Sequence, residues 1–211
     1  HINTQMPGVA EHAEHLVNQQ LRCHGVASLK GLTYLRRDSA LRKAVKDLVT
    51  ERLAQHEMEQ VRLGNGDIFL IESGALERST PRVKNRLVIL SPFDNCVIQR
   101  DRLRSLFQYD YQIECYVPAV KRQYGYFCLP LLYRDEFIGR MDCKAHRKAK
   151  HLEIKALHLE TDFADDELSV LAFAEAMTEF CRFQECDTVS LTSIHPKSAG
   201  PRIQSALNAL V

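Results

Sequence analysis

The 211-residue sequence contains no Cys-x-x-Cys pair, although it has seven cysteines. An odd number without paired spacing argues against a disulfide framework and against a zinc ribbon. Most of these cysteines lie between apolar residues, and we interpret them as small core residues in a reducing cytosol. No apolar run approaches the roughly 20 residues that a membrane-spanning helix needs, and no signal peptide is evident. We therefore expect a cytoplasmic protein that does not enter a membrane.

The sequence also lacks a strong net charge, since 28 Lys and Arg balance 27 Asp and Glu. Its apolar and charged fractions are typical of a folded globular protein, and its length suits one large domain or two small ones. The chain begins with His1 rather than Met. We interpret it as a fragment of a longer protein.

The first 55 residues predict three helices, because apolar residues recur there at helical spacing. The helices are expected over residues 10–23, 29–35 and 39–53. Gly25 is expected to end the first helix, Ser28 to cap the second, and Asp38 or Ser39 to cap the third. The third helix presents Arg42, Lys43 and Lys46 on its polar face.

Two β-prone runs follow, residues 58–63 and 67–71, joined by Gly64-Asn65-Gly66. Asn-Gly between β-formers is a strong hairpin signal, because turn residues must tolerate positive φ. Three helices followed by a hairpin is the winged-helix order, a variant of helix-turn-helix. The sequence therefore predicts a winged-helix domain over residues 10–73, followed by a linker with one helical turn around Leu76.

Residues 86–211 predict a second domain that is mainly antiparallel β with C-terminal helices. Strands are expected over residues 87–90, 112–117, 124–133, 137–144, 151–160 and 188–194. Asp101 is expected to cap a helix that ends near Phe107. A longer helix begins at Asp162 or Asp165 and ends near Cys186, and a last helix covers 201–210. The predicted fold class is α+β, with four consecutive strands joined by short turns in one antiparallel sheet.

Charge is separated along this second domain. Residues 121–150 hold eight Lys and Arg against three Asp and Glu, whereas residues 153–187 hold ten acids against two bases. Basic residues interleaved with tyrosines suit phosphate contacts and stacking on bases. Solvated surface charge is the simpler explanation of such runs, but the winged-helix pattern favours DNA, with the acidic helix facing away from it.

The most specific segment lies between residues 90 and 147. It contains Leu-Ser-Pro-Phe-Asp at 90–94, Glu-Cys-Tyr-Val-Pro-Ala at 114–119, Lys-Arg-Gln-Tyr-Gly-Tyr at 121–126, Gly-Arg-Met-Asp at 139–142 and Lys-Ala-His-Arg at 144–147. This ordered series resembles the C-terminal half of the bacterial winged-helix DNA glycosylases that excise alkylated bases and unhook interstrand crosslinks. The winged-helix pattern extends the resemblance weakly towards residue 10.

The resemblance implies hydrolysis of the N-glycosidic bond of a damaged nucleotide in double-stranded DNA, with no metal and no organic cofactor. Such chemistry needs a carboxylate or amide that orients water and stabilises an oxocarbenium-like sugar. In the family these groups form a Gln-apolar-Asp or Gln-apolar-Gln motif near the N-terminus of the whole protein, upstream of the region matched here. Gln108-Tyr109-Asp110 has that pattern, but its position favours an aromatic core stretch with polar surface residues. Gln108, Asp110 and Asp142 are therefore weak catalytic candidates.

The candidate DNA contacts combine the third helix with the basic middle segment. Arg140, Asp142 and Lys144 share one face of a predicted strand, because side chains alternate along a strand. They form either a phosphate clamp or a surface ion pair. The full set of candidates is Arg42, Lys43, Lys46, Lys121, Arg122, Tyr124, Arg140, Lys144, His146 and Arg147. A metal site at His146 and His151 lacks a third ligand at suitable spacing.

Two other functions remain open from the sequence. One is a winged-helix regulator whose β domain senses a ligand or pairs subunits. The other is a protein-interaction module that does not bind nucleic acid.

Overall fold

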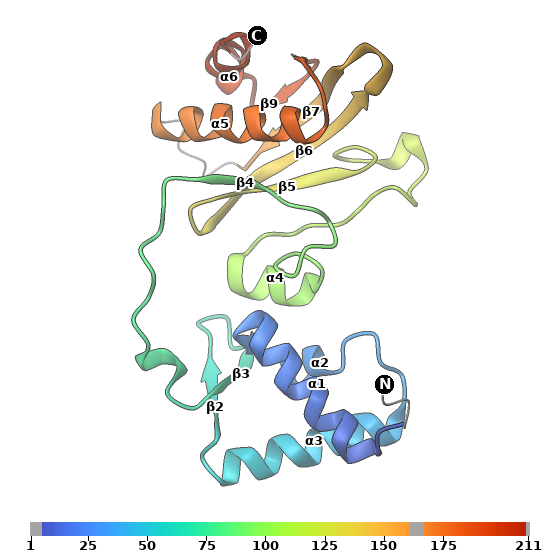
Figure 1. Cartoon of the computed structure of the whole chain (residues 1–211), viewed down its shortest axis with the longest axis vertical. Coiled ribbons are helices and arrows are strands. Elements are labelled where there is room, and N and C mark those ends of the chain that lie inside the picture. Colours follow the sequence, from blue (N-terminus) through green and yellow to red (C-terminus); the bar gives the residue numbers. More distant parts are fainter. Residues whose placement is uncertain (1–5, 161–166, 210–211) are drawn as a thin grey trace, which may run out of the picture. The chain divides into compact units, whose positions relative to one another are not determined.

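The computed structural model describes residues 6–160 and 167–209, which form a mixed α and β fold (Figure 1). The chain divides into two compact units. Unit 1 comprises residues 1–80 and 99–108, and unit 2 comprises residues 81–98 and 109–211. The chain thus leaves unit 1, returns to it for one helix and leaves again. Among the described residues, no helix has the length and apolarity needed to cross a membrane.

Unit 1 begins with three helices, α1 (Val9–His24), α2 (Leu29–Leu32) and α3 (Ser39–Ala54). The expected caps form: Gly25 has a φ of 71° and donates its N–H to Leu21, Ser28 accepts from the Gly31 N–H, and Asp38 accepts from the Leu41 N–H. The expected helix over 29–35 stops at Leu32, and Leu35 has a φ of 59°. That left-handed conformation is incompatible with a continuing helix.

The small sheet of unit 1 is antiparallel, in the order β1 (Val26–Ala27), β3 (Ile68–Glu72), β2 (Met58–Arg62). The predicted hairpin is confirmed. Its turn is longer than an Asn-Gly dipeptide, because Leu63 donates to Asp67 across residues 64–66 and only Gly66 among them has positive φ. Sequence reasoning missed β1, which is only two residues long. After β3, η1 (Ala75–Glu77) is the expected helical turn in the linker.

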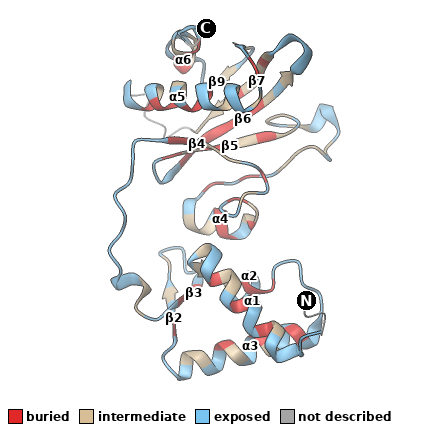
Figure 2. Ribbon diagram, in the orientation of Figure 1, coloured by how far each residue is buried: buried red, intermediate tan, exposed pale blue. Residues whose placement is uncertain are grey.

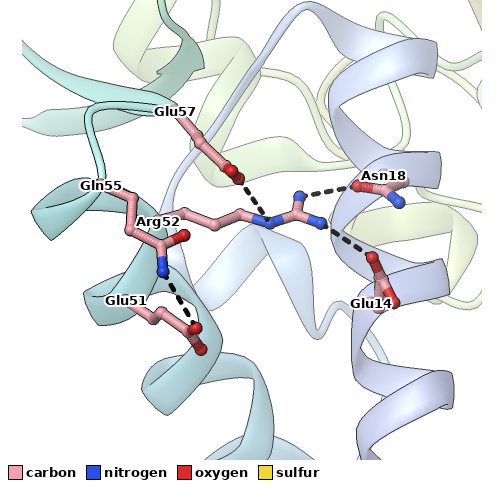
Figure 3. Close-up of polar contacts among 6 residues, drawn as sticks. All are labelled: Glu14, Asn18, Glu51, Arg52, Gln55 and Glu57. Carbon is pink, nitrogen blue, oxygen red and sulfur yellow. Dashed lines mark hydrogen bonds and ion pairs between the residues drawn. The ribbon is translucent and has the colours of Figure 1, made fainter.

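Apolar faces of the three helices and the three strands form the core of unit 1, around Leu16, Val17, Leu32 and Val45. A polar network lies beside it, where Arg52 of α3 reaches α1 and the start of β2 (Figure 3). Its Nη1 donates to Asn18 over 2.7 Å, its Nη2 lies 3.3 Å from Glu14, and its Nε lies 3.7 Å from Glu57. This guanidinium is largely buried and fixes α3 against α1.

The helix α4 (Arg100–Phe107) belongs to unit 1, although the sequence-based division places it within 86–211. The buried amide of Gln99 donates to Gln20 and to the carbonyl of Gly31. Ser105 donates to Asp67 in the hairpin turn. The expected cap at Asp101 is wrong, since the helix starts after Gln99 and Asp101 instead pairs with Lys30.

Unit 2 is built on a six-stranded sheet in the order β4-β5-β6-β7-β8, with β9 also paired to β7. The strands are β4 (Leu87–Ile89), β5 (Cys128–Tyr133), β6 (Glu136–His146), β7 (His151–Leu159), β8 (Thr188–Leu191) and β9 (Ile194–His195). The first four are antiparallel neighbours, whereas β8 and β9 run parallel to β7. The single strand expected over 188–194 is therefore two short parallel strands. Three 3-10 turns, η2 (Ala119–Lys121), η3 (Arg147–Ala149) and η4 (Lys197–Ala199), lie between these elements.

Two helices, α5 (Glu167–Phe183) and α6 (Gly200–Asn208), lie on the same side of this sheet, with α5 against it (Figure 1). The core between these helices and the sheet is the larger of the two hydrophobic cores in the described residues, and Figure 2 shows its buried strands. It includes Met141 and Ile154 from the strands, Phe173 and Met177 from α5, and Ile203 from α6. The expected helix starts at Asp162 and Asp165 lie outside the described residues.

The strand expected over 112–117 does not form, and the one expected from 124 begins at Cys128. The late start of the second strand has its cause in side-chain hydrogen bonds. Backbone N–H groups that a strand would use for its ladder are taken by carboxylates: Glu114 accepts from residues 123–125, and Asp142 accepts from residues 126 and 127. Side-chain acceptors of this kind compete directly with regular secondary structure.

All seven cysteines lie in the described residues and remain thiols. Cys128 and Cys186 are buried, and Cys143 and Cys181 pack partly against the core of unit 2. Burial raises the pKa of Cys128 to about 12 and that of Cys143 to about 12. Cys23 and Cys96 are exposed, so the expectation of small core residues holds for only part of the set.

Candidate nucleic-acid interface

The sheet of unit 2 has two chemically different faces. Side chains alternate along β6, so Met141, Cys143 and Ala145 point into the core beneath α5. Arg140, Asp142, Lys144 and His146 are on the opposite face. The acidic helix α5 and this polar face therefore lie on opposite sides of one sheet.

Arg140 is the centre of a buried aromatic cluster on that polar face. Only 3% of its side chain is exposed, and its Nη2 lies 2.9 Å from Glu160. The guanidinium carbon is 4.1 Å from the ring centre of Tyr124, 4.6 Å from that of Tyr109 and 5.8 Å from that of Tyr111. A cation held over ring faces and desolvated in this way is strongly stabilised. Burial lowers the pKa of Arg140, but Tyr109 and Glu160 outweigh that effect and the net pKa is raised.

The segment between the two tyrosines and β5 is fixed by side-chain hydrogen bonds. Tyr109 donates its hydroxyl to the carbonyl of Gly139 over 2.8 Å, and Tyr111 donates to Cys128 over 2.6 Å. Glu114 accepts three backbone N–H groups, from Gln123 at 2.8 Å and from the next two residues at 2.7 and 3.1 Å. Burial raises the pKa of Glu114, yet these three donors lower it below its ordinary value.

Asp142 completes this support from the sheet. Its carboxylate accepts from the N–H of Tyr126 at 2.9 Å and from that of Phe127 at 3.4 Å. Gly125, with a φ of 149°, lies directly over it, and a Cβ there would come within 2.6 Å of the Asp142 Cγ. Glycine at position 125 is therefore what allows the loop to close onto the carboxylate.

The catalytic candidates differ in their surroundings. Gln108 ends α4 in unit 1, with a left-handed φ of 53°, whereas Asp110 is an exposed residue of unit 2. Tyr109, between them, is buried in the Arg140 cluster. Both oxygens of Asp142 accept backbone N–H groups, as described above. The aromatic core stretch that the sequence favoured at this point is the observed structure.

The basic candidates fall into three groups. In unit 1, Arg42, Lys43 and Lys46 are all exposed on α3, where Lys43 pairs with Asp47 at 2.6 Å and Arg42 donates to the carbonyl of Arg36. On the 114–127 loop of unit 2, Lys121 is exposed, and Arg122 donates to the carbonyl of Val117 and lies over the Tyr126 ring.

The third group lies at the β6–β7 turn, where Lys144 and Arg147 are exposed. His146 lies 2.8 Å from Glu153 and its ring stacks on that of His151. His151 in turn contacts Thr188 and Ser190. In the described part of the chain, no group of three or more His, Cys, Asp or Glu is arranged to hold a metal ion.

Arg140 is on a strand but is buried, so it does not form an ion pair on the surface. Tyr124 is half-buried against the guanidinium. Sequence reasoning found these two residues but missed their partners Tyr109, Glu114 and Glu160. A signal was present, because Tyr109 and Tyr111 are two residues apart and so can present their rings to the same side.

Comparison with protein families decides the relationship. A family model described as DNA glycosylase AlkZ-like matches residues 4–183. The chain belongs to this family. The comparison with solved structures finds no match. The match to the AlkZ-like family covers unit 1 from residue 4, the aromatic cluster around Arg140, the β6–β7 turn and the whole of α5. The resemblance expected from the 90–147 segment is confirmed.

Membership of the AlkZ-like DNA glycosylases indicates a function in DNA repair, with DNA as the substrate. Exposed lysines and arginines on α3, on the 114–127 loop and at the β6–β7 turn have the chemistry that phosphate contacts require.

Proposed function

We propose that this chain is the DNA-binding portion of a DNA repair glycosylase that hydrolyses the N-glycosidic bond of alkylated or crosslinked bases. The observation that carries the proposal is the AlkZ-like family match over residues 4–183. Double-stranded DNA with damaged bases is the proposed partner. The seven thiols agree with a reducing, cytoplasmic location.

Within this proposal, residues 10–73 are a winged-helix domain. The support is the element order α1-β1-α2-α3-β2-β3 and the antiparallel order β1-β3-β2. In winged-helix and other helix-turn-helix proteins, the helix at the position of α3 lies in the major groove. Arg42, Lys43 and Lys46 are then its phosphate or base contacts.

Residues 86–211 form the proposed second DNA-binding domain, apart from α4. Lys121, Lys144, His146 and Arg147 are its direct phosphate contacts, because their side chains reach solvent. Arg122 contributes from its partly buried position over Tyr126. Arg140 and Tyr124 act differently: they support the 114–127 loop from beneath, since the guanidinium is enclosed by tyrosines.

We further propose that the catalytic amide or carboxylate lies in a segment that precedes residue 1. The local geometry supports this, because Asp142 is occupied by backbone donors and Gln108 and Asp110 flank the buried Tyr109 of the aromatic core stretch. The decisive experiment expresses the chain with and without its natural upstream region and measures release of an alkylated base from duplex DNA. The longer protein should release the base and the short chain should not. Release by the short chain would place catalysis within residues 1–211.

A second candidate function is a winged-helix regulator with a ligand-sensing β domain. It is favoured by a cavity of about 590 Å³ in unit 2, between the sheet and α5, lined mainly by apolar side chains such as Leu129, Cys143 and Phe180. That volume is typical of small-molecule sites. High affinity for one duplex sequence, independent of damage, would favour this function over repair.

A further inference from the structure

The loop that Glu114 closes exposes two large apolar side chains at its tip. Tyr116 is 89% exposed and Val120 is 94% exposed. A single exposed apolar residue is common on protein surfaces, but apolar side chains gathered at one place mark interaction sites more often. The neighbouring residues Pro118 and Ala119 are exposed as well, so the tip projects into solvent.

The tip is nevertheless rigidly built. Val117 donates its N–H to the carbonyl of Glu114 at 2.9 Å, and Lys121 donates to Pro118 at 2.9 Å, which makes two successive tight turns. Arg122 ties them together by donating its Nε to the carbonyl of Val117 at 2.9 Å. The base of the loop is held by the Glu114 carboxylate. The conformation of the tip is thus set before any partner arrives, which lowers the entropic cost of binding.

The charge around the tip identifies the kind of partner. No Asp or Glu occurs from Cys115 to Gln123, whereas Lys121 and Arg122 do. Lys121 is exposed next to Val120, and Arg122 lies 4.9 Å from the ring centre of the half-exposed Tyr126. The Glu114 carboxylate at the base of the loop is engaged by backbone N–H groups, whereas the cations Lys121 and Arg122 lie beside the tip. An aromatic and an aliphatic side chain in such surroundings are complementary to a polyanion that offers flat apolar faces.

We propose that the 114–123 loop is a wedge that inserts Tyr116, supported by Val120, into the base stack of duplex DNA beside a weakened base pair. Lys121 contacts the adjoining phosphate. The inference rests on the proposed DNA-binding function. Apolar wedges between base steps are a recognised way to unstack a duplex, and a mispaired or damaged base is the least costly to displace.

The test compares duplexes of about 25 base pairs that are fully paired or contain one mispair next to 2-aminopurine. The full chain, Tyr116→Ser, Tyr116→Phe and Phe183→Ser are titrated against both. Phe183 is the matched control, because it is also exposed, at 78%, but lies on α5. Since Tyr116 is almost fully exposed, its replacement should leave the circular dichroism melting curve unchanged.

The full chain should bind the mispaired duplex more tightly than the paired one and raise 2-aminopurine fluorescence. Tyr116→Ser should lose about 5- to 150-fold affinity for the mispaired duplex, because stacking on one base contributes that much. It should also lose the fluorescence change. Its affinity for the paired duplex should stay within about twofold, and Tyr116→Phe and Phe183→Ser should behave like the full chain.

If the full chain and Tyr116→Ser bind with the same affinity, and each binds the paired and the mispaired duplex equally, the wedge is overturned and DNA binding stands. Failure of the full chain to bind any duplex would overturn the proposed function together with the wedge. If Tyr116→Ser instead converts a dimer to a monomer in sedimentation while DNA affinity is unchanged, the tip is a self-association surface and the wedge is wrong.

Discussion

Glu114→Gln is the most informative single change in unit 2. Its carboxylate accepts three backbone N–H groups, two on Oε2 and one on Oε1. A glutamine amide can keep its oxygen as the acceptor for the N–H groups of Tyr124 and Gly125. Its N–H₂ group then faces the N–H of Gln123, so that hydrogen bond is lost. Hydrogen bonds to a charged acceptor contribute about 1.5–3 kcal/mol each, against about 0.5–1.5 for neutral ones. Weakening two and losing one amounts to about 3.5–6 kcal/mol on these ranges. Because Glu114 is only half-buried, water replaces part of this, and we expect a loss of about 2–4 kcal/mol of unfolding free energy.

Urea denaturation followed by far-ultraviolet circular dichroism at pH 7 measures this loss. Hydrogen exchange of the peptide spanning residues 114–127 should accelerate at 123–125 in the variant. The pH profile provides an independent check. Folding lowers the pKa of Glu114, so the ionised carboxylate stabilises the folded state. This contribution to the unfolding free energy is fully present above pH 4.5. It is lost as the pH falls through the pKa that Glu114 has in the folded protein, which is below 4.5. In Glu114→Gln, the unfolding free energy should therefore fall less between neutral and acidic pH than in the unaltered chain.

Glu136→Gln is the control, because that side chain is exposed. It should change the unfolding free energy by no more than about 0.5 kcal/mol. If Glu114→Gln behaves like this control and exchange at 123–125 is unchanged, the carboxylate does not hold the loop.

Three further changes test other parts of the structure. Arg52→Met should destabilise unit 1 by about 1–3 kcal/mol in urea, because the largely buried guanidinium contacts three partners; an unchanged midpoint would contradict its role. Gly125→Ala should cost about 2 kcal/mol or more, since its Cβ meets Asp142, whereas Gly64→Ala, with open space around it, should cost less than about 1 kcal/mol. Burial and the nearby His195 lower the pKa of His158, so stability should fall as the pH drops below 6.5, where the unfolded chain takes up a proton that the folded chain resists. His158→Gln should remove this part of the pH profile, and an unchanged profile would contradict the assignment.

Much of unit 1 was predictable because its signals are local. Caps at Ser28 and Asp38 and the Gly64–Gly66 turn act through neighbouring residues, and each can be identified in the sequence. The end of α2 was not predictable in this way. The left-handed conformation of Leu35 arises where the chain turns towards α3, and nothing in the residue type signals it.

The errors in unit 2 have one physical origin. Residues 124–127 have strand-like composition, but Glu114 and Asp142 occupy the backbone donors of residues 123–127, so β5 begins only at Cys128. This competition depends on contacts between residues about 10 to 16 positions apart. Strand order and the parallel pairing of β7 with β8 are equally non-local.

The candidate site was predicted in part. Alternation along β6 correctly grouped Arg140 with Asp142, but periodicity does not say whether a face is open to solvent. Of the tyrosines that cover Arg140, Tyr124 lies 16 residues earlier in the chain, and Tyr109 and Tyr111 lie 31 and 29 residues earlier. Burial by such distant residues changes a possible phosphate contact into an internal support.

The salt dependence of DNA affinity tests the central claim most directly. Two triple variants to Gln, one at Arg42, Lys43 and Lys46 and one at Lys121, Lys144 and Arg147, are compared with a control triple at Lys155, Arg182 and Lys197. Each phosphate contact adds about 0.9 to the slope of log affinity against log salt concentration. Each of the first two variants should reduce that slope by about 2–3, and the control should not. Equal slopes in all four proteins, or no binding to duplex DNA, would contradict the account.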